Sequence, residues 1–382
     1  MHFTLGSVSC SLWLIVCGIG CGSSSSPSAT GVGGAATGGQ GTAPDADAGG
    51  AGGLGAGGNG GNEAATGGWV GVEPDYPLAA AGSAGTPKPS GAVGNLKILN
   101  WAGFKGAVTY TFDDTNQSQL DNYAALKALG ARMTYYLITD KIKAANTPAW
   151  TQVLNDGNEL GNHTVLHLQT EASALQMDNA TTAIEQTFGV RPWTFAAPYG
   201  YASYEPLAKT RFLVNRGVVN ALVKPNDDTD PFNLPCYIPP TGGTAATDFN
   251  PQIDSAESGG GWRIVLVHGF TGGSDYAYQP VSIDEFVAGV AHAQSLGDMW
   301  IDSMVNVAAY WRAQKLLTAV TPSTSGSSTT WAWTLPDNFP PKKRLRVTVD
   351  GGTLSQNGQN LEWNDHGYYE VSLDALTLTL SP

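Results

Sequence analysis

Residues 107–114 read AVTYTFDD, a run of strand-forming residues that ends in two adjacent aspartates. Aspartate is depleted in strands and neighbouring carboxylates repel each other, so the pair marks the point where the strand stops. Short β-rich runs like this one alternate with helical patterns from about residue 97 to about residue 315. Such alternation predicts an α/β fold with a parallel sheet or barrel. In these folds the chemistry lies at the carboxyl ends of the strands, where the two aspartates are expected.

Hydrophobic periodicity and turn signals predict the other elements of this region. The predicted helices cover residues 119–130, 148–157, 172–189, 283–297 and 304–314. The predicted strands are rich in β-branched and aromatic residues and cover residues 107–112, 132–139, 193–197 and 263–267. A further short strand is expected just before His163.

Side chains suited to metal binding and proton transfer follow several of these strands. They are Asp113 and Asp114, the histidines His163 and His167 four residues apart, and His268. Each has an ordinary interpretation, because paired aspartates are common in turns and a histidine at a strand end is often structural. Together, two imidazoles and one carboxylate can hold a divalent first-row metal with positions left open. The second carboxylate can then accept a proton from water.

Four short motifs, taken in order, resemble the polysaccharide deacetylases of carbohydrate esterase family 4, the NodB homology domain. They are TFDD (111–114), HTVLH (163–167), the second half of FAAPYG (195–200) and LVH (266–268). The resemblance covers about residues 97–315. It implies a distorted (β/α) barrel, which agrees with the alternation of strands and helices.

The resemblance also implies a role for each motif residue. The implied metal ligands are Asp114, His163 and His167. The implied catalytic groups are Asp113 as general base, His268 as general acid and the backbone N–H of Tyr199 as an oxyanion donor. Thr164 would brace its loop, Leu266 would line the acetyl pocket, and Pro198 would contact the substrate.

One position departs from the family pattern. The third motif often carries an arginine that pairs with the general base, and this chain has Ala196 there. The family's fourth motif, which supports that arginine, is not evident either. Arg216 is a candidate to orient Asp113 in its place. The alternative is that Arg216 is an exposed residue at the start of a loop.

The function expected from these features is metal-dependent removal of acetyl groups from an N-acetylated cell-envelope or extracellular polysaccharide. Zn²⁺ is the expected metal, with Co²⁺ or Ni²⁺ as alternatives. An O-acetyl esterase of the acetylxylan type and a non-catalytic glycan-binding protein are the alternative functions. An α/β-hydrolase is disfavoured, because the region expected to fold contains no G-x-S-x-G motif.

Charge and the N-terminal sequence indicate where the protein acts. The net charge of −13 and the absence of a basic stretch argue against nucleic acid as a partner. Residues 1–21 resemble a bacterial lipoprotein signal with Cys21 as the lipidated residue; a plain secretory signal is the alternative. Residues 22–95 are rich in Gly, Ala and Ser and are expected to form a disordered tether. Membrane association is expected only through the lipid anchor, and the sequence does not indicate an oligomeric state.

Residues 322–382 have a different pattern. Short alternating runs separated by Gly, Asn and Asp predict a small antiparallel β domain. Its tryptophans Trp331, Trp333 and Trp363 could stack on sugar rings. The favoured interpretation is that they fill the core, because a domain of this size needs large apolar side chains to form one.

Overall fold

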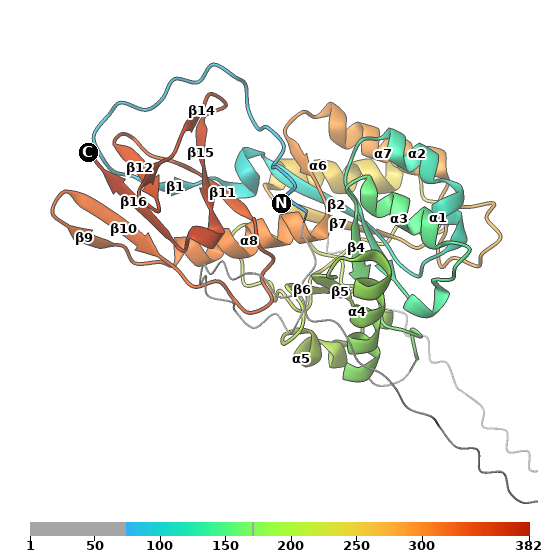
Figure 1. Ribbon diagram of the computed structural model, residues 1–382. Helices are drawn as coiled ribbons and strands as arrows, with labels where there is room; N and C mark the ends of the chain where they lie inside the picture. Colours follow the sequence, from blue (N-terminus) through green and yellow to red (C-terminus); the bar gives the residue numbers. More distant parts are fainter. Residues whose placement is uncertain (1–73, 170–171) are drawn as a thin grey trace, which may run out of the picture. The chain divides into compact units, whose positions relative to one another are not determined.

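The computed structural model describes residues 74–169 and 172–382 (Figure 1). The predicted signal peptide, its Cys21 and most of the predicted tether lie outside the described residues. All of the described residues fall within one compact unit. Within the described ranges, no helix is both long and apolar enough to cross a membrane.

A curled seven-stranded parallel sheet forms the centre of the α/β region, so the predicted fold class is confirmed. Its order is β6-β5-β4-β3-β2-β7, and β8 pairs with the first half of β2. The strands are β2 (Gly106–Phe112), β3 (Thr134–Leu137), β4 (Glu159–Asn162), β5 (Thr194–Ala196), β6 (Val214–Arg216), β7 (Trp262–Val267) and β8 (Met299–Ile301). Every residue of β2 and β7 is buried, as expected for parallel strands covered on both faces.

A loop segment spans the gap between the two edge strands β6 and β7. Leu234 forms a parallel bridge with Arg216 on β6, and Tyr237 forms another with Val265 on β7. Between them, the N–H of Cys236 donates to the carbonyl of Val219 (2.9 Å). The sequence did not predict a strand here, because prolines surround the segment. Its two bridges connect the carboxyl end of β6 to β7.

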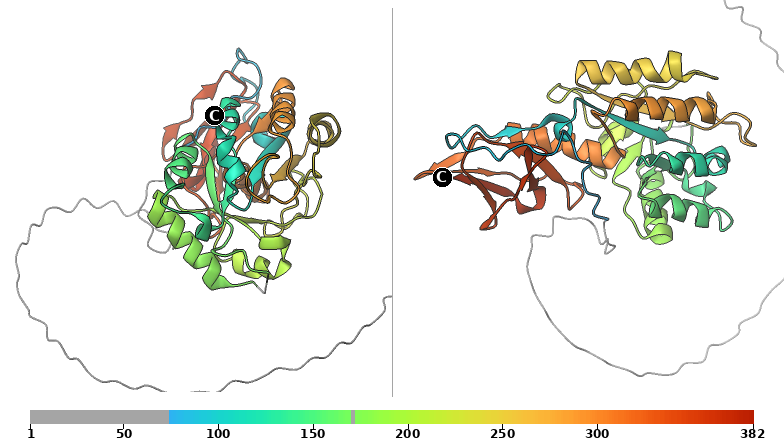
Figure 2. Two further views of the ribbon diagram at one scale, coloured as in Figure 1. Left: turned by 90° about the vertical axis from the view of Figure 1, so that its right-hand side faces the viewer. Right: turned by 90° about the horizontal axis from the view of Figure 1, so that it is seen from above.

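Helices follow most of the strands. They are α1 (Gln117–Asp121), α2 (Tyr123–Ala128), α3 (Thr147–Asn155), α4 (Ala174–Phe188), α5 (Glu205–Ala208), α6 (Asn250–Gly259), α7 (Ile283–Ser295) and α8 (Met304–Thr318). The helix predicted at 119–130 is divided at Asn122, whose side-chain amide donates to the carbonyl of Ser118 (2.8 Å). Helix α4 begins at a capping serine, Ser173, and ends at Gly189 with φ 70°. Helices α6 and α7 lie side by side (Figure 2).

The C-terminal region forms two antiparallel sheets. One has the order β1-β11-β15-β14, and the other β13-β12-β16-β10-β9. The strands are β1 (Lys97–Ile98), β9 (Ser323–Ser325), β10 (Ser328–Ala332), β11 (Arg344–Thr348), β12 (Thr353–Gln356), β13 (Gln359–Asn360), β14 (Trp363–Asn364), β15 (Tyr368–Ser372) and β16 (Thr377–Ser381). Strand β1 pairs with β11 although it precedes the α/β region in the chain, which the predicted boundary at residue 97 did not anticipate.

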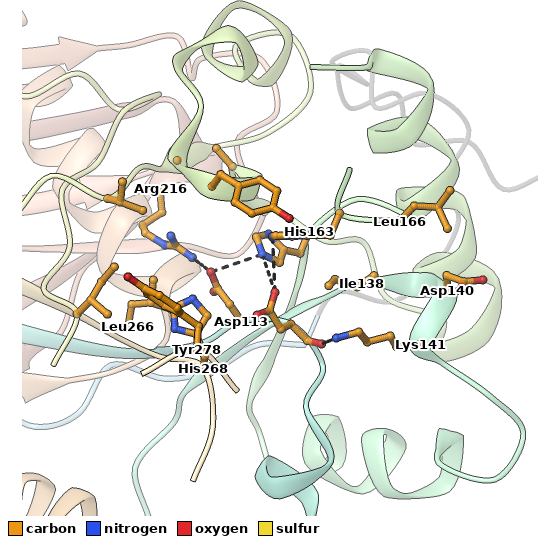
Figure 3. Close-up of a pocket in the computed structure, with 17 residues that line it drawn as sticks. Asp113, Ile138, Asp140, Lys141, His163, Leu166, Arg216, Leu266, His268 and Tyr278 are labelled. Carbon is orange, nitrogen blue, oxygen red and sulfur yellow. Dashed lines mark hydrogen bonds and ion pairs between the residues drawn. The ribbon is translucent and has the colours of Figure 1, made fainter. Parts of the chain in front are cut away.

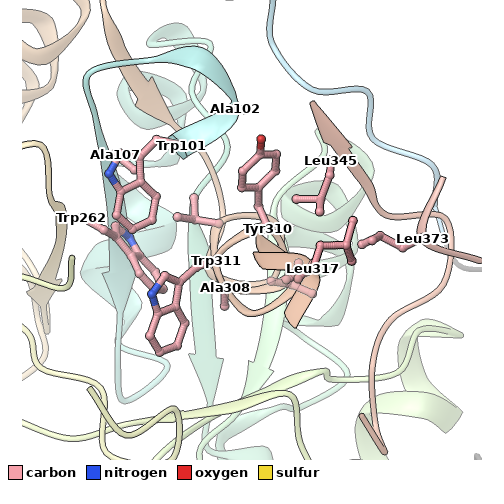
Figure 4. Close-up of a cluster of buried hydrophobic side chains, with 14 of the residues drawn as sticks. Trp101, Ala102, Ala107, Trp262, Ala308, Tyr310, Trp311, Leu317, Leu345 and Leu373 are labelled. Atoms are coloured by element: carbon pink, nitrogen blue, oxygen red, sulfur yellow. The ribbon is translucent and has the colours of Figure 1, made fainter. Parts of the chain in front are cut away.

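One hydrophobic core joins the α/β region to these sheets. Trp101, Trp262 and Trp311 pack in a row, with ring centroids 6.4 and 6.3 Å apart, on one side of α8 (Figure 4). Leu345 and Leu373 belong to the same cluster from the β sheets. The three tryptophans that could have bound sugar contribute here, because Trp333 is buried and Trp331 and Trp363 pack against the cluster. The core interpretation of these side chains is therefore the one that fits.

Residues 74–95 differ from the expected tether, because they lie against the β sheets. The buried guanidinium of Arg346, on β11, donates to the carbonyls of Leu78 (3.2 Å) and Ala79 (2.7 Å). It also donates to the carbonyl of Ala102 (3.0 Å) and forms an ion pair with Glu370. We call residues 74–95 the strap. Several of the contacts of the strap are made by its backbone carbonyls, and such contacts leave no pattern in the sequence.

Candidate active site

Most of the predicted site residues lie on loops that follow β2, β4, β5 and β7, at the carboxyl ends of the strands. Arg216 is the last residue of β6, and Leu266 lies within β7. Several of these residues have a left-handed backbone conformation although they are not glycine. They are Asp114 (φ 73°), Thr115 (φ 56°), Thr164 (φ 66°), His167 (φ 51°) and Tyr199 (φ 56°). Such conformations are unfavourable for most side chains and concentrate at functional sites. The positive φ values therefore identify these loops as a candidate functional site.

The carboxylate of Asp114 and the rings of His163 and His167 converge. Asp114 Oδ1 is 3.6 Å from Nε2 of each histidine, and one ligand atom from each residue lies within 4.8 Å of the others. Ligands ~2.1 Å from a tetrahedral metal are about 3.4 Å from one another, so the spacing fits a bound Zn²⁺. Burial and the nearby His163 lower the pKa of His167 to about 4, so this ring is neutral at neutral pH, as a metal ligand must be.

Hydrogen bonds fix the ring of His163 and the backbone of His167. Nδ1 of His163 lies 2.8 Å from the carbonyl of Ala196, which can only accept, so the proton is on Nδ1 and the Nε2 lone pair faces the site. The hydroxyl of Thr164 accepts from the N–H of His167 (3.0 Å). The backbone N–H of Thr164 donates to Asn162 Oδ1 (2.8 Å). The loop between the two histidines is thus braced at Thr164.

Asp113 lies beside this triad and is paired with a buried arginine. Its Oδ2 accepts from Nη2 of Arg216 and is 3.6 Å from Nε2 of His163, as Figure 3 shows. Its Oδ1 is buried and has no hydrogen-bond partner among the described residues. Arg216 is held in turn by the carbonyl of Gly217 (3.3 Å) and lies over the ring of Tyr136 (5.5 Å). It is fully buried, so the alternative of an exposed loop residue does not hold.

His268 lies on the other side of Asp113, next to Tyr278 (Figure 3). Gln119 connects the loop of His268 to the loop of Asp113. Its side-chain amide donates to the carbonyls of Asp113 (2.6 Å) and His268 (2.8 Å). Asn116 donates a further hydrogen bond to the His268 carbonyl (2.8 Å). Burial lowers the pKa of His268 below its ordinary value despite the two aspartates nearby.

A cavity of about 660 Å³ contains these groups. Leu266 and Tyr199 line it, whereas Pro198 is buried and is not among its lining residues. Sequence reasoning missed several contributors, namely Gln119, Lys141, Ile238 and Tyr278. None belongs to a motif, and only their position after a strand end could have marked them.

Residues 103–214 match the family model for polysaccharide deacetylase. The matched segment contains Asp113, the three residues of the triad and Tyr199, and it ends before Arg216 and His268. No curated protein matches this sequence.

Solved structures that this chain is similar to include the following, each with low sequence identity. A family 4 acetyl xylan esterase from Clostridium thermocellum, in complex with a cobalt ion, is 15% identical (53% of this chain, 89% of that chain, TM-score 0.37). The peptidoglycan deacetylase PdaC from Bacillus subtilis is 19% identical (55% and 93%, TM-score 0.37). A family 4 carbohydrate esterase from Streptomyces lividans, in complex with acetate, is 16% identical (53% and 94%, TM-score 0.37).

Proposed function

We propose that this protein is a metal-dependent deacetylase that removes acetyl groups from an N-acetylated cell-envelope or extracellular polysaccharide. The observation that carries the proposal is the convergence of Asp114, His163 and His167 beside a carboxylate, Asp113, with one unpartnered oxygen. The match of residues 103–214 to the polysaccharide deacetylase family supports it independently.

The triad of Asp114, His163 and His167 would hold the metal, which we propose to be Zn²⁺, with Co²⁺ or Ni²⁺ as alternatives. A metal bound there would lower the pKa of a water ligand and polarise an acetyl carbonyl. Lys141 supports the triad from outside, because its Nζ donates to the backbone carbonyl of Asp114 (2.8 Å).

The remaining residues would move protons and stabilise charge. The carboxylate of Asp113 would accept the proton of the attacking water, while Arg216, which is paired with Oδ2, fixes the direction of the carboxylate. The backbone N–H of Tyr199 would donate to the carbonyl oxygen as negative charge develops on it. His268 would protonate the departing nitrogen, and acetate and an amine would be the products. Leu266 would contact the acetyl methyl group from the cavity wall.

Acetate release separates this function from its alternatives. Residues 74–382, loaded with zinc, would be assayed on N-acetylglucosamine oligomers and on acetylated xylan, with and without a chelator. We expect release from the oligomers that is lost with chelator and in Asp114→Ala, whereas His292→Ala, a surface histidine paired with Asp254, keeps full activity. Release from xylan alone would instead indicate an O-acetyl esterase. No release from either substrate by a folded, zinc-loaded protein would overturn the proposal in favour of glycan binding.

We further propose that the protein is exported and anchored by lipid at Cys21. The basis is the sequence of residues 1–21. Mass spectrometry of the mature N-terminus tests this proposal, because an acylated Cys21 is expected and an unmodified residue at the cleavage site would contradict it.

A further inference from the structure

Exposed apolar side chains are concentrated around the mouth of the cavity. Among the described residues, most of the large exposed hydrophobic side chains lie on the loops after β4, β5, β6 and β7. Those that also line the cavity are Leu166, Tyr199, Val218 and Tyr278. Exposed apolar surface of this kind around a polar floor marks a binding site more often than chance.

Tyr278 is the aromatic member of this group that no motif or reaction step explains. Its side chain is 59% exposed, yet its ring meets the ring of His268 edge-on, with centroids 5.2 Å apart and an interplanar angle of 87°. An edge-on contact occupies the rim of one ring and leaves a face of the tyrosine uncovered. Figure 3 shows Tyr278 beside His268, on the side of the cavity away from Lys141 and Leu166.

The loop that carries Tyr278 is held in place at several points. Phe270 and Val281 form a bridge at its base, where the N–H of Thr271 donates to the carbonyl of Val281 (2.9 Å). Asp275 accepts from the N–H of Ser118 (2.5 Å), which ties the loop to the start of α1. Gly269 leaves room for Ala277, because a Cβ at Gly269 would lie 2.7 Å from the Cβ of Ala277. The ring of Tyr278 is thus presented by a fixed loop, which reduces the entropy lost on binding.

We propose that Tyr278 forms a sugar-binding subsite, on which the pyranose ring next to the reacting one stacks. A pyranose has apolar C–H faces that match an exposed aromatic face, and the phenol hydroxyl can bond to a sugar hydroxyl at the same time. The cavity of about 660 Å³ is much larger than an acetyl group requires. This proposal rests on the proposed function, and it specifies that the substrate is a glycan chain engaged through more than one sugar.

The loop provides its own matched control. Tyr276 lies two residues away, is fully exposed and does not line the cavity. The test compares Tyr278→Ala, Tyr278→Phe and Tyr276→Ala in the zinc-loaded chain. Binding of the N-acetylglucosamine tetramer and dimer would be titrated in the cold, with acetate measured in the same samples and thermal unfolding checked for each variant.

We expect Tyr278→Ala to weaken binding of the tetramer about tenfold and of the dimer much less. Tyr278→Phe should weaken tetramer binding less than Tyr278→Ala does, because it keeps the stacking face and loses only the hydroxyl. Tyr276→Ala should bind the tetramer as the wild type does. Equal binding by Tyr278→Ala and wild type would overturn the subsite, as would a loss of kcat with unchanged binding, since this would make Tyr278 a shield for His268. Failure of the wild type to bind the tetramer would also overturn it. Binding that depends on Tyr278 without any acetate release would uphold the subsite and overturn the proposed reaction.

Discussion

The guanidinium of Arg216, at the end of β6, is ion-paired with the carboxylate of Asp113, which lies 103 residues earlier at the end of β2. Both side chains are almost completely buried. Strand β6 is at one edge of the sheet, and β2 is next to β7 at the other edge. The segment 234–237 forms one bridge to β6 and another to β7. The third motif has Ala196 where an arginine is expected, and Arg216 on β6 places a positive charge beside Asp113 instead.

Replacing Arg216 should separate catalysis from metal binding. In Arg216→Met, Asp113 loses the partner that fixes its rotamer, so we expect turnover to fall about 10- to 100-fold. Zinc affinity should change little, because the triad has its own supports at Ala196 and Thr164. The variant should also lose about 3–5 kcal/mol of stability, since the Asp113 charge remains buried.

Arg263→Met is the matched control for this loss. Arg263 is also buried, on β7, and it donates to Asn220 (2.8 Å) and to the carbonyl of Ala221 (3.0 Å), away from the triad. Steady-state kinetics and zinc titration would be measured for both variants. Equal loss of turnover in the two would mean that Arg216 serves the fold alone.

Replacing Lys141 should weaken metal binding from outside the triad. The Nζ of Lys141 donates to the carbonyl of Asp114, a residue with φ 73° whose backbone needs support. We expect Lys141→Met to raise the dissociation constant for zinc about tenfold. Lys143→Met is the control, because Lys143 is exposed and reaches only Asp140, at 3.5 Å. Zinc titration that gives the same constant for both variants would contradict a role for Lys141.

Glu159 should make the stability of the fold depend on pH. It lies at the start of β4, accepts from the hydroxyls of Thr134 (2.9 Å) and Thr194 (2.6 Å) and the N–H of Val305 (2.8 Å), and burial raises its pKa from 4.5 to about 7. Between these two values the folded state keeps a proton that the unfolded chain releases. The free energy of unfolding therefore falls as the pH rises through this window, by about 3 kcal/mol from this group.

Glu159→Gln removes this dependence. Relative to wild type, the variant should gain about 3 kcal/mol between pH 4.5 and 7 in urea unfolding experiments. Glu362→Gln, at an exposed position, should follow the wild type at every pH. Parallel curves for Glu159→Gln and wild type would show that Glu159 ionises in the folded state as it does in the unfolded chain.

The strap should be required for full stability. Arg346→Met removes the donor to the carbonyls of Leu78, Ala79 and Ala102 and leaves Glu370 without its partner. We expect it to lower the free energy of unfolding by about 3–5 kcal/mol. Arg344→Met, which breaks only a more exposed pair with Asp75, should cost about 1 kcal/mol or less.

Truncation tests the same contact from the other side. A chain that begins at residue 95 should unfold at a lower temperature than one that begins at residue 74. If both chains unfold at the same temperature, the strap does not contribute to stability.

The sequence predicted the elements with a strong pattern. Strands β2, β3 and β7 are rich in apolar, aromatic and β-branched residues, and α4 and α7 have helical periodicity with caps, so their positions agree with expectation. Strands β6 and β8 have three residues each, and β6 contains Asn215 and Arg216, so neither stood out. Helix α6 was missed because it has few apolar residues.

The residues of the candidate site also fall into those that the sequence predicted and those that it did not. The side chains in motifs were identified because a fixed spacing accompanies their chemistry, and the structure brings Asp113, Asp114, His163, His167 and His268 into one cavity. Gln119 and Lys141 act by donating to backbone carbonyls, which every residue has. Tyr278 depends on the path of a loop. Such contacts depend on three-dimensional proximity and leave no pattern along the chain.

Strand β1 comes before the α/β region in the chain and pairs with β11, which comes after it. In chain order the α/β region therefore lies between two paired strands of the β domain, and a single crossover between genes near residue 322 would leave β11 with an unpaired edge. Exchanging either part for another would require two simultaneous crossovers. We therefore expect the two parts to be inherited together. Homologues with this C-terminal domain should also have β1 and the strap, and the domain should not occur joined to other domains.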